Sequence, residues 1–145
     1  MSTVIHASRE RVWRALAEPA ELIRWDERIL SLEQPAPDYP HGDQPARWRY
    51  RLGSVPVGLE DRPVEVVPCK RLRHAMAIGA FRFEETYTLS EEDPDHTRLS
   101  LRLAAPSNSV PVVGGSLDRF DVRRLASEIV DENLRSIQSW CESTP

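Results

Sequence analysis

Between residues 46 and 104 the chain repeatedly alternates apolar and polar side chains, and this alternation constrains the fold more than any other feature. In ARWRYRL (46–52), Trp48 and Tyr50 point to one side, and the three arginines that alternate with them point to the other. A period of two, in short segments separated by turns, is typical of antiparallel strands with one buried face. Together with ILSLEQ (29–34), the region predicts about six antiparallel strands that share an apolar face.

Two glycine-containing turns predict which side chains lie opposite one another. A hairpin turn at Gly53-Ser54 pairs Trp48 with Leu59. A second turn at Gly79-Ala80 aligns four pairs: Ile78 with Phe81, Met76 with Phe83, His74 with Glu85, and Leu72 with Tyr87. An imidazole and a carboxyl group thus share an otherwise apolar row, and opposed Cβ atoms lie about 4.5–5.5 Å apart, within reach of a hydrogen bond.

The strand from 55 to 67 changes phase along its length. Val57 and Leu59 occupy odd positions, whereas Val64 and Val66 occupy even ones. A one-residue bulge near Asp61 would restore the alternation, and the proline that follows is tolerated at a bulge or a sheet edge. The bulge leaves the direction of the Asp61 side chain open.

Helical segments precede and follow the strands. SRERVWRALAE (8–18) has Ser8 as its expected N-cap, and EPAELIRW (18–25) has Pro19 in its first turn. Residues 117–143 contain no Gly or Pro and predict one long helix. Its expected N-cap is Ser116, and its apolar stripe consists of Leu125, Ile129, Ile137 and Cys141.

With a short strand at 2–7, the predicted order is one strand, two short helices, about six strands and a long C-terminal helix, which is an α+β arrangement. The sheet must cover its apolar face, and the long helix is the obvious cover. A curved, strongly twisted sheet wrapped around a helix leaves an internal cavity. The loop at 105–116 is a candidate lid over that cavity, with Gly114-Gly115 as its hinge.

The length and composition limit the class of protein. A chain of 145 residues predicts a single domain, 1–145, and 40% hydrophobic residues suffice for a sizeable core. The net charge of −4 disfavours general nucleic-acid binding, which needs many basic side chains. Cys69 and Cys141 lack metal or redox spacing and are expected to be reduced thiols. With no signal-peptide pattern and no membrane-length apolar run, we expect a cytoplasmic protein without a membrane span.

No motif for a cofactor or a metal is evident. His6, His41 and His96 do not show ligand spacing with cysteines or acids, so no metal site is expected. The glycine-rich nucleotide motifs and the serine-hydrolase motif are absent from the sequence, so we expect no cofactor. Seven arginines on the outward face of the strands either form a solvated surface interleaved with glutamates or meet an acidic carrier protein: Arg47, Arg49, Arg51, Arg71, Arg73, Arg98 and Arg102. A homodimer also remains open.

Four stretches resemble the START-like superfamily, which has the helix-grip fold and includes polyketide cyclase/dehydrase-like proteins and other SRPBCC ligand-binding proteins. They are IHASRERVWRALAEPAELIRW, VEVVPCKRLRH, FRFEETYTLSEEDPDHTRLSL and ENLRSIQSWCE, and together they span nearly the whole chain. The resemblance implies a curved sheet of about seven strands around the C-terminal helix, with a cavity for an apolar small molecule. It carries over no catalytic residues, because the fold hosts many chemistries.

The residues expected on the cavity wall are Trp25, Trp48, Tyr50, Leu59, His74, Met76, Phe83, Glu85, Tyr87, Leu101 and Asn133. His74 and Glu85 orient the ligand, act as a catalytic acid/base pair, or form a structural cross-strand pair. Asp26 is expected to be solvated. The first functional hypothesis is a binding protein for a lipid, polyketide or aromatic compound. The alternatives are a cofactor-independent aromatase/cyclase or dehydratase and an interaction module of the chaperone-activator type.

Overall fold

The computed structural model describes residues 1–34, 36–105 and 119–145, and the side chains of residues 119–123 are outside the description. Within these ranges, seven strands form one antiparallel sheet in the order β1-β7-β6-β5-β4-β3-β2. The strands are β1 (Ser2–Ile5), β2 (Ile29–Gln34), β3 (Ala46–Leu52), β4 (Val55–Val67), β5 (Arg71–Ile78), β6 (Phe81–Asp93) and β7 (His96–Ala104). The helices are α1 (Arg9–Ala17), α2 (Pro19–Trp25) and α3 (Arg119–Ser143).

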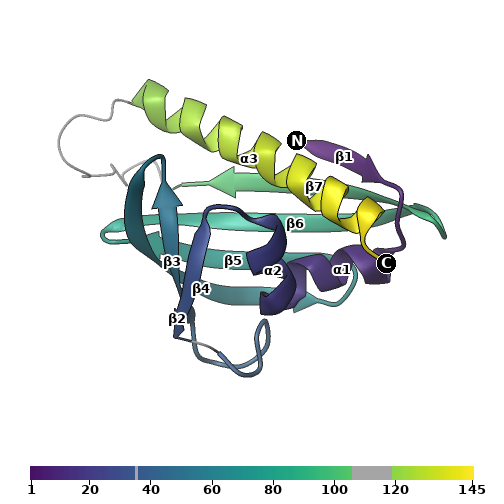
Figure 1. Ribbon diagram of the computed structural model, residues 1–145, viewed down its shortest axis with the longest axis horizontal. Coiled ribbons are helices and arrows are strands. Elements are labelled where there is room, and N and C mark those ends of the chain that lie inside the picture. The colour runs from purple at the N-terminus through teal and green to yellow at the C-terminus, as the bar shows by residue number, and fades with distance from the viewer. Residues whose placement is uncertain (35, 106–118) are drawn as a thin grey trace.

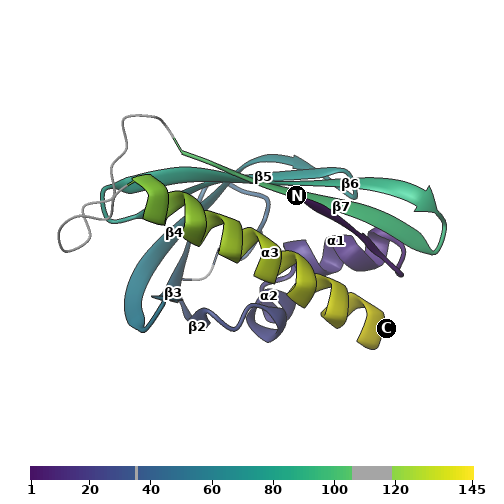
Figure 2. The ribbon, with the colours of Figure 1, turned by 90° about the horizontal axis from the view of Figure 1, so that it is seen from above.

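The arrangement is the predicted α+β helix-grip fold. Helix α3 crosses one face of the sheet diagonally, and α1 and α2 lie on the same side near its C-terminal end (Figure 1). Seen from above, the sheet is curved, and β3 and β2 curl toward the side that carries α3 (Figure 2). The short helices begin as predicted: the Ser8 hydroxyl accepts the backbone N–H of Arg11, and Pro19 occupies the first turn of α2.

The predicted strand register is confirmed. Trp48 lies opposite Leu59, and His74 lies opposite Glu85. Both turns use a glycine with positive φ, because Gly53 and Gly79 each have φ of 59°. The irregularity in the pairing of β4 with β5 falls between Pro63 and Glu65. It therefore comes after Asp61, which keeps the inward direction of Leu59.

Two local expectations need correction. The stretch SEEDPDH (90–96) was expected to be a connecting turn, but β6 continues to Asp93 and β7 begins at His96, and Arg98 pairs with Glu92 across the two strands. Leu125 is exposed and does not belong to the buried stripe of α3. Among the side chains of α3 that the structure describes, from residue 124 onward, the buried ones start at Val130, and β1, β7, α1 and α2 contact this helix. Most of the predicted loop at 105–116, the hinge Gly114-Gly115 and the N-cap Ser116 lie outside the described residues.

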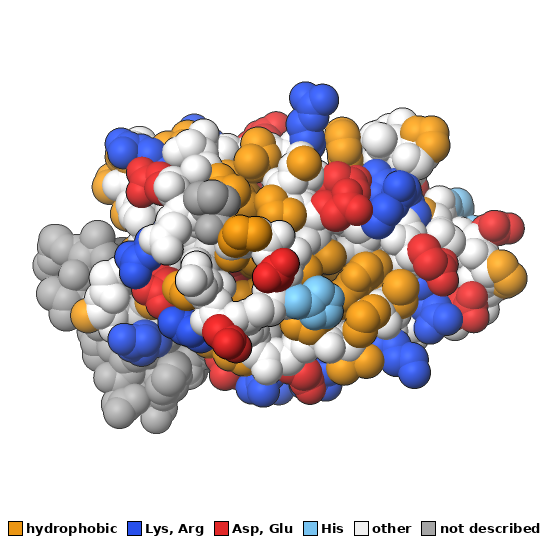
Figure 3. Space-filling model, turned by 90° about the horizontal axis from the view of Figure 1, so that it is seen from below, with side chains coloured by type: hydrophobic (Ala, Val, Ile, Leu, Met, Phe, Trp, Pro, Cys, Tyr) orange, Lys and Arg blue, Asp and Glu red, His pale blue; other side chains and the backbone are white. Residues whose placement is uncertain are grey.

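The outward face of the sheet carries ion pairs between arginines and glutamates. Arg71 Nε lies 2.7 Å from Glu65 Oε1, and Arg73 contacts both Glu65 and Glu84. Arg47 and Arg49 also approach glutamates, at 3.5 and 3.8 Å. Figure 3 shows a different side of the molecule, seen from below, where acidic and basic side chains are also interspersed with hydrophobic ones. These pairs agree with a solvated surface, and an acidic carrier protein as partner stays a prediction.

The buried side chains fall into two groups, named here for use below. The core end lies between β1, β6, β7, α1 and α3, and consists mainly of aliphatic side chains such as Ile5, Leu99, Leu101 and Ile137. The cavity end lies along β3, β4 and the neighbouring parts of β5 and β6, around Trp48, Tyr50 and Leu59.

Candidate ligand-binding cavity

A cavity lies at the cavity end, between the concave face of the sheet and helices α2 and α3. Its empty volume, including the opening to solvent, is about 700 Å³. All but one of the residues predicted for its wall line it: Trp25, Trp48, Tyr50, Leu59, His74, Met76, Phe83, Glu85, Tyr87 and Asn133. The exception is Leu101, which is buried among the aliphatic side chains of the core end. That the lining residues contact a ligand stays a prediction.

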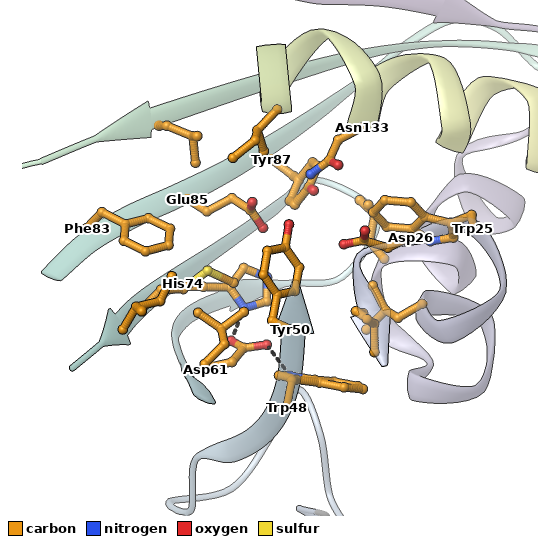
Figure 4. Close-up of a pocket in the computed structure, with 18 of the residues that line it drawn as sticks. Trp25, Asp26, Trp48, Tyr50, Asp61, His74, Phe83, Glu85, Tyr87 and Asn133 are labelled. Atoms are coloured by element: carbon orange, nitrogen blue, oxygen red, sulfur yellow. Dashed lines mark hydrogen bonds and ion pairs between the residues drawn. The ribbon is translucent and has the colours of Figure 1, made fainter. Parts of the chain in front are cut away.

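His74 is held by Asp61. The imidazole Nδ1 lies 2.7 Å from Asp61 Oδ1, and both side chains are almost fully buried. The other carboxylate oxygen, Oδ2, accepts hydrogen bonds from the Tyr39 hydroxyl at 2.7 Å and from Trp48 Nε1 at 3.2 Å. Figure 4 shows the bonds from His74 and Trp48 to Asp61 at the base of the cavity. Asp61 therefore has three protein partners.

The hydrogen bond expected between His74 and Glu85 is replaced by the bond from His74 Nδ1 to Asp61. The register opposes His74 to Glu85 as predicted, but Asp61 lies diagonally across from His74 on the other neighbouring strand, where its opposite residue is Met76. Diagonal neighbours in a sheet lie within reach of long side chains. The imidazole of His74 therefore hydrogen-bonds to Asp61 and not to Glu85.

The pair of His74 and Asp61 has the electrostatics of an ion pair. Burial alone would lower the pKa of His74, but the charge and hydrogen bond of Asp61, with the charge of Glu85, raise it above its ordinary value. Burial alone would raise the pKa of Asp61, but the charge of His74 and the three hydrogen bonds lower it. Both shifts favour imidazolium beside carboxylate.

Glu85 is a carboxyl group on this wall whose pKa lies near neutral. Its side chain points into the cavity from β6 (Figure 4). Burial, opposed by the charge of His74 and reinforced by the charges of Asp61 and Asp26, raises the pKa of Glu85 to about 7. A hydrogen bond with Tyr87 lowers it in part. Glu85 therefore exchanges its proton near neutral pH.

Asp26 is buried, contrary to the expectation that it is solvated. It follows the last residue of α2, and its side chain turns toward the cavity (Figure 4). Its Oδ1 accepts the backbone N–H of Arg28 at 3.0 Å. Burial raises the pKa of Asp26, although that hydrogen bond and the charge of Arg28 oppose the rise. A second carboxyl group with a raised pKa thus lies on the wall.

Three neutral polar side chains lie near the two carboxyl groups. The hydroxyl of Tyr50, from β3, lies between Glu85 and Asp26 in Figure 4. Burial and the charge of Asp26 raise the pKa of Tyr50, while burial and the charge of Glu85 raise the pKa of Tyr87. Asn133 reaches the cavity from α3, and its side chain partly offsets the rise in the pKa of Tyr87. Polar side chains from β3, β4, β5, β6 and α3, together with Asp26 after α2, therefore line the same cavity.

Three residues of this site were not predicted from the sequence: Tyr39 was not a candidate, the direction of Asp61 was left open, and Asp26 was expected to be solvated. Tyr39 lies in the segment between β2 and β3, which has no strand or helix period to indicate its direction. Trp25, by contrast, ends α2 as expected, is buried, and donates its Nε1–H to the carbonyl of Ala15 at 2.8 Å. Asp26 follows directly after this anchored tryptophan, which is the one local signal that could have indicated its burial.

The described residues contain no cluster of three or more His, Cys, Asp or Glu side chains that could hold a metal ion. In the same part of the chain, none of the helices combines the length and the apolar character that crossing a bilayer requires.

Comparisons with solved structures find the same fold in other proteins. A START superfamily protein of Mycobacterium smegmatis matches with a TM-score of 0.78 and 14% identity, over 99% of this chain and 95% of that chain. An aromatase/cyclase (Zhui) of a Streptomyces species matches with 0.75 and 14%, over 98% and 91%. TTHA0849 of Thermus thermophilus matches with 0.70 and 25%, over 99% and 95%.

Comparisons of the sequence with curated proteins and with family models give two further results. No curated protein matches the sequence. The model of a family described as polyketide cyclase / dehydrase and lipid transport matches residues 1–142. Because this match spans nearly the whole chain, the protein belongs to the family of polyketide cyclases/dehydrases and lipid-transport proteins.

Proposed function

We propose that the protein binds a hydrophobic small molecule in the cavity between the sheet and α3, with the buried polar side chains fixing its orientation. The observation that carries this proposal is the cavity itself, which is mainly apolar but receives buried polar groups from several elements. Ligand sites of small molecules combine a hydrophobic lining with a few placed polar groups in this way.

The energetics of the polar groups support the same conclusion. A buried carboxyl group without a full set of partners costs stability, and its raised pKa is a measure of that cost. Glu85 and Asp26 both have raised pKa values, largely through burial. Apolar replacements would remove the cost if stability alone mattered. A role in recognising a ligand gives these groups a reason to be on the wall.

The proposed division of roles follows the chemistry of the wall. Trp25, Leu59, Met76 and Phe83 give the ligand apolar and aromatic contacts, together with Trp48. Glu85, Tyr50, Tyr87 and Asn133 hydrogen-bond its polar group. His74, fixed by Asp61, presents the rest of its ring to the same space. Leu101 supports the sheet from the core end and is not assigned a contact.

A binding experiment with a neutral dye tests the proposal. Native mass spectrometry of the freshly purified protein reveals any small molecule that accompanies it, and Nile red fluorescence then measures binding to the stripped protein. Met76→Trp, which fills the cavity, should weaken Nile red binding at least about tenfold, which corresponds to about 1.4 kcal/mol. Val64→Trp, at an exposed position of β4, is the matched control. Equal dye binding by the wild type and Met76→Trp would reject the cavity as the binding site.

Acid/base catalysis is the second candidate, and one observation favours it: a group that exchanges its proton near neutral pH lies opposite a buried imidazole. In this mechanism the Glu85 carboxylate takes a proton from a carbon next to a ligand carbonyl. The His74 imidazolium, oriented by Asp61, donates a proton to the carbonyl oxygen, so the C–H bond breaks, an O–H bond forms, and the product is an enol. No redox partner or cofactor is needed for this step.

Deuterium exchange at the α-carbon of naphthylacetone in heavy water, followed by NMR, tests the catalytic candidate. If it holds, the wild type accelerates the exchange and Glu85→Gln lowers that acceleration at least about tenfold. Glu84→Gln is the matched control, because Glu84 is the neighbouring residue on the outward face of β6, where it pairs with Arg73. A wild-type rate equal to that of buffer, with naphthylacetone bound, would leave the protein as a binding protein only.

A further inference from the structure

The cavity wall is acidic. Its ionisable side chains in the described part of the chain include the carboxyl groups of Asp26, Asp61 and Glu85 and the imidazole of His74, but neither Lys nor Arg. A ligand that carries a carboxylate or a phosphate would therefore meet acidic groups and no flexible cation. Such a wall differs from what an anionic lipid headgroup requires, since basic side chains bind carboxylate and phosphate.

The positive charge of His74 does not neutralise the whole wall. Its Nδ1 lies 2.7 Å from Asp61, so imidazolium and carboxylate compensate each other. Arg28, whose charge acts on Asp26 and Tyr50, forms an ion pair with Glu132, which is not among the residues that line the cavity. Within the part of the chain that the structure describes, no Lys or Arg side chain forms an ion pair with Glu85 or Asp26, although the charge of Arg28 acts on Asp26.

Aromatic rings line the same part of the cavity. Trp25, Tyr50, Phe83 and Tyr87 belong to its wall, and Figure 4 shows them around the space that Glu85 and Asp26 enter from opposite sides. The faces of aromatic rings attract cations, and this attraction is strongest where water is excluded. Carboxyl groups and aromatic rings around one partly buried space together suit an organic cation.

We infer that the ligand of this cavity is an apolar molecule with a basic amine, whose ammonium group lies between Glu85 and Asp26 against the rings of Tyr50 and Tyr87. The inference rests on the proposed function, because it names the chemistry of the ligand for the same site. An ammonium group pairs with Glu85 and Asp26 and is attracted by the rings, a neutral hydroxyl only hydrogen-bonds, and a carboxylate is repelled.

The raised pKa of Glu85 gives the inference a pH signature. The free protein holds a proton on Glu85 below about pH 7, and an ammonium ligand binds best after this proton has left. The polar groups that share the wall with Glu85 are Asp26, Tyr39, Tyr50, Asp61, His74 and Asn133 from other parts of the chain, with Tyr87 on its own strand. Affinity for the amine should accordingly rise between about pH 6 and 8, whereas affinity for a neutral analogue should not rise.

Three naphthalene probes of matched size test the inference: naphthylethylamine, naphthylethanol and naphthylacetate. Isothermal titration calorimetry with the wild type at about pH 8 should give the order amine, alcohol, carboxylate, with the amine bound at least about tenfold more tightly than the alcohol. Glu85→Gln should reduce the ratio of the two constants to about threefold or less, because the amine loses its charged partner whereas the alcohol loses only a neutral hydrogen bond. Glu84→Gln, on the opposite face of the strand, should keep the wild-type ratio.

The outcomes separate the inference from the proposed function. Alcohol binding as tight as amine binding, or carboxylate binding tighter than either, overturns the inference and leaves a cavity for apolar ligands. Nile red binding in the cavity without detectable binding of the amine overturns the inference alone. If neither the dye nor any of the three probes binds, the proposed function is wrong as well. The comparison among probes uses the wild-type protein, so it does not depend on whether a variant folds.

Discussion

At the core end, β1, β7 and β6 pack against α1 and the C-terminal half of α3, whereas at the cavity end β3, β4 and β5 curve around an incompletely filled space. Aliphatic side chains such as Leu99 and Ile137 dominate the core end, and both are fully buried. The cavity end instead contains buried carboxyl groups with shifted pKa values. One sheet therefore serves two purposes, and stability and recognition should be separable by mutation.

The largest expected effect is the cost of truncating α3 at the core end. Ile137→Ala should lower the free energy of unfolding by about 4 kcal/mol, because Ile137 is fully buried and its removal leaves a void among tightly packed side chains. Ile129→Ala, on the same helix but beside the cavity, should cost about 1 kcal/mol, since Ile129 already borders empty space. Urea denaturation followed by circular dichroism measures both. Equal losses would mean that the two ends contribute alike.

The next effect is the loss of the buried ion pair at the cavity end. Asp61→Asn should lower the free energy of unfolding by about 3 kcal/mol, because the His74 imidazolium loses the carboxylate that compensates its buried charge. Asparagine keeps an oxygen for the hydrogen bonds from Tyr39 and Trp48. NMR titration should show that the pKa of His74 falls in the variant.

A surface pair provides the control for Asp61. Glu65→Gln removes the partner of Arg71 on the exposed outward face and should cost no more than about 1 kcal/mol. A loss from Asp61→Asn as small as the loss from Glu65→Gln would contradict the ion pair of His74 and Asp61 as a stabilising contact.

Replacing Glu85 should have a smaller effect on the free energy of unfolding, and this effect should be stabilising. Its pKa is raised from 4.5 to about 7 in the folded protein, so the folded state holds the proton more tightly than the unfolded chain. The stability that this provides is fully present below 4.5 and is lost as the pH rises through about 7. Glu85→Gln should therefore raise the free energy of unfolding at about pH 8 by on the order of 2 kcal/mol.

Denaturation at a series of pH values measures this effect. The wild type should lose stability between pH 4.5 and about 7, and Glu85→Gln should lose much less over that interval. His74 also has a raised pKa in the folded protein, so it contributes a further loss of stability that begins at a higher pH than the loss from Glu85. Identical pH profiles for the wild type and Glu85→Gln would show that Glu85 is not a buried group with a shifted pKa.

The difference between the two ends also explains what the sequence could predict. Alternation of apolar and polar residues, together with the turns at Gly53 and Gly79, was enough for the register, including the opposition of His74 and Glu85. These are local rules with a period of two, and they hold at both ends of the sheet. They determine which side chains face inward, and so nearly all of the predicted cavity wall.

The hydrogen bonds within the cavity could not be predicted in the same way. Which carboxyl group bonds to His74 depends on diagonal neighbours and on the position of the bulge, and the bulge falls after Asp61. Tyr39 reaches Asp61 from an aperiodic segment, and Asp26 is turned inward at the end of α2. Such contacts between elements have no periodic signal in the sequence, and they set the chemistry of the cavity.

The smallest expected effect is the coupling between the two ends. In a double-mutant cycle, Ile137→Ala and Glu85→Gln should combine to within about 0.5 kcal/mol of the sum of the single effects, because the two side chains belong to different ends. Asp61→Asn and Glu85→Gln should differ from additivity by about 1 kcal/mol or more, since both carboxyl groups act on the charge of His74. A deviation from additivity of that size between Ile137 and Glu85 would show that the packing of the core end and the stability of the cavity end depend on each other. The core end could then no longer be treated as energetically independent of the cavity end.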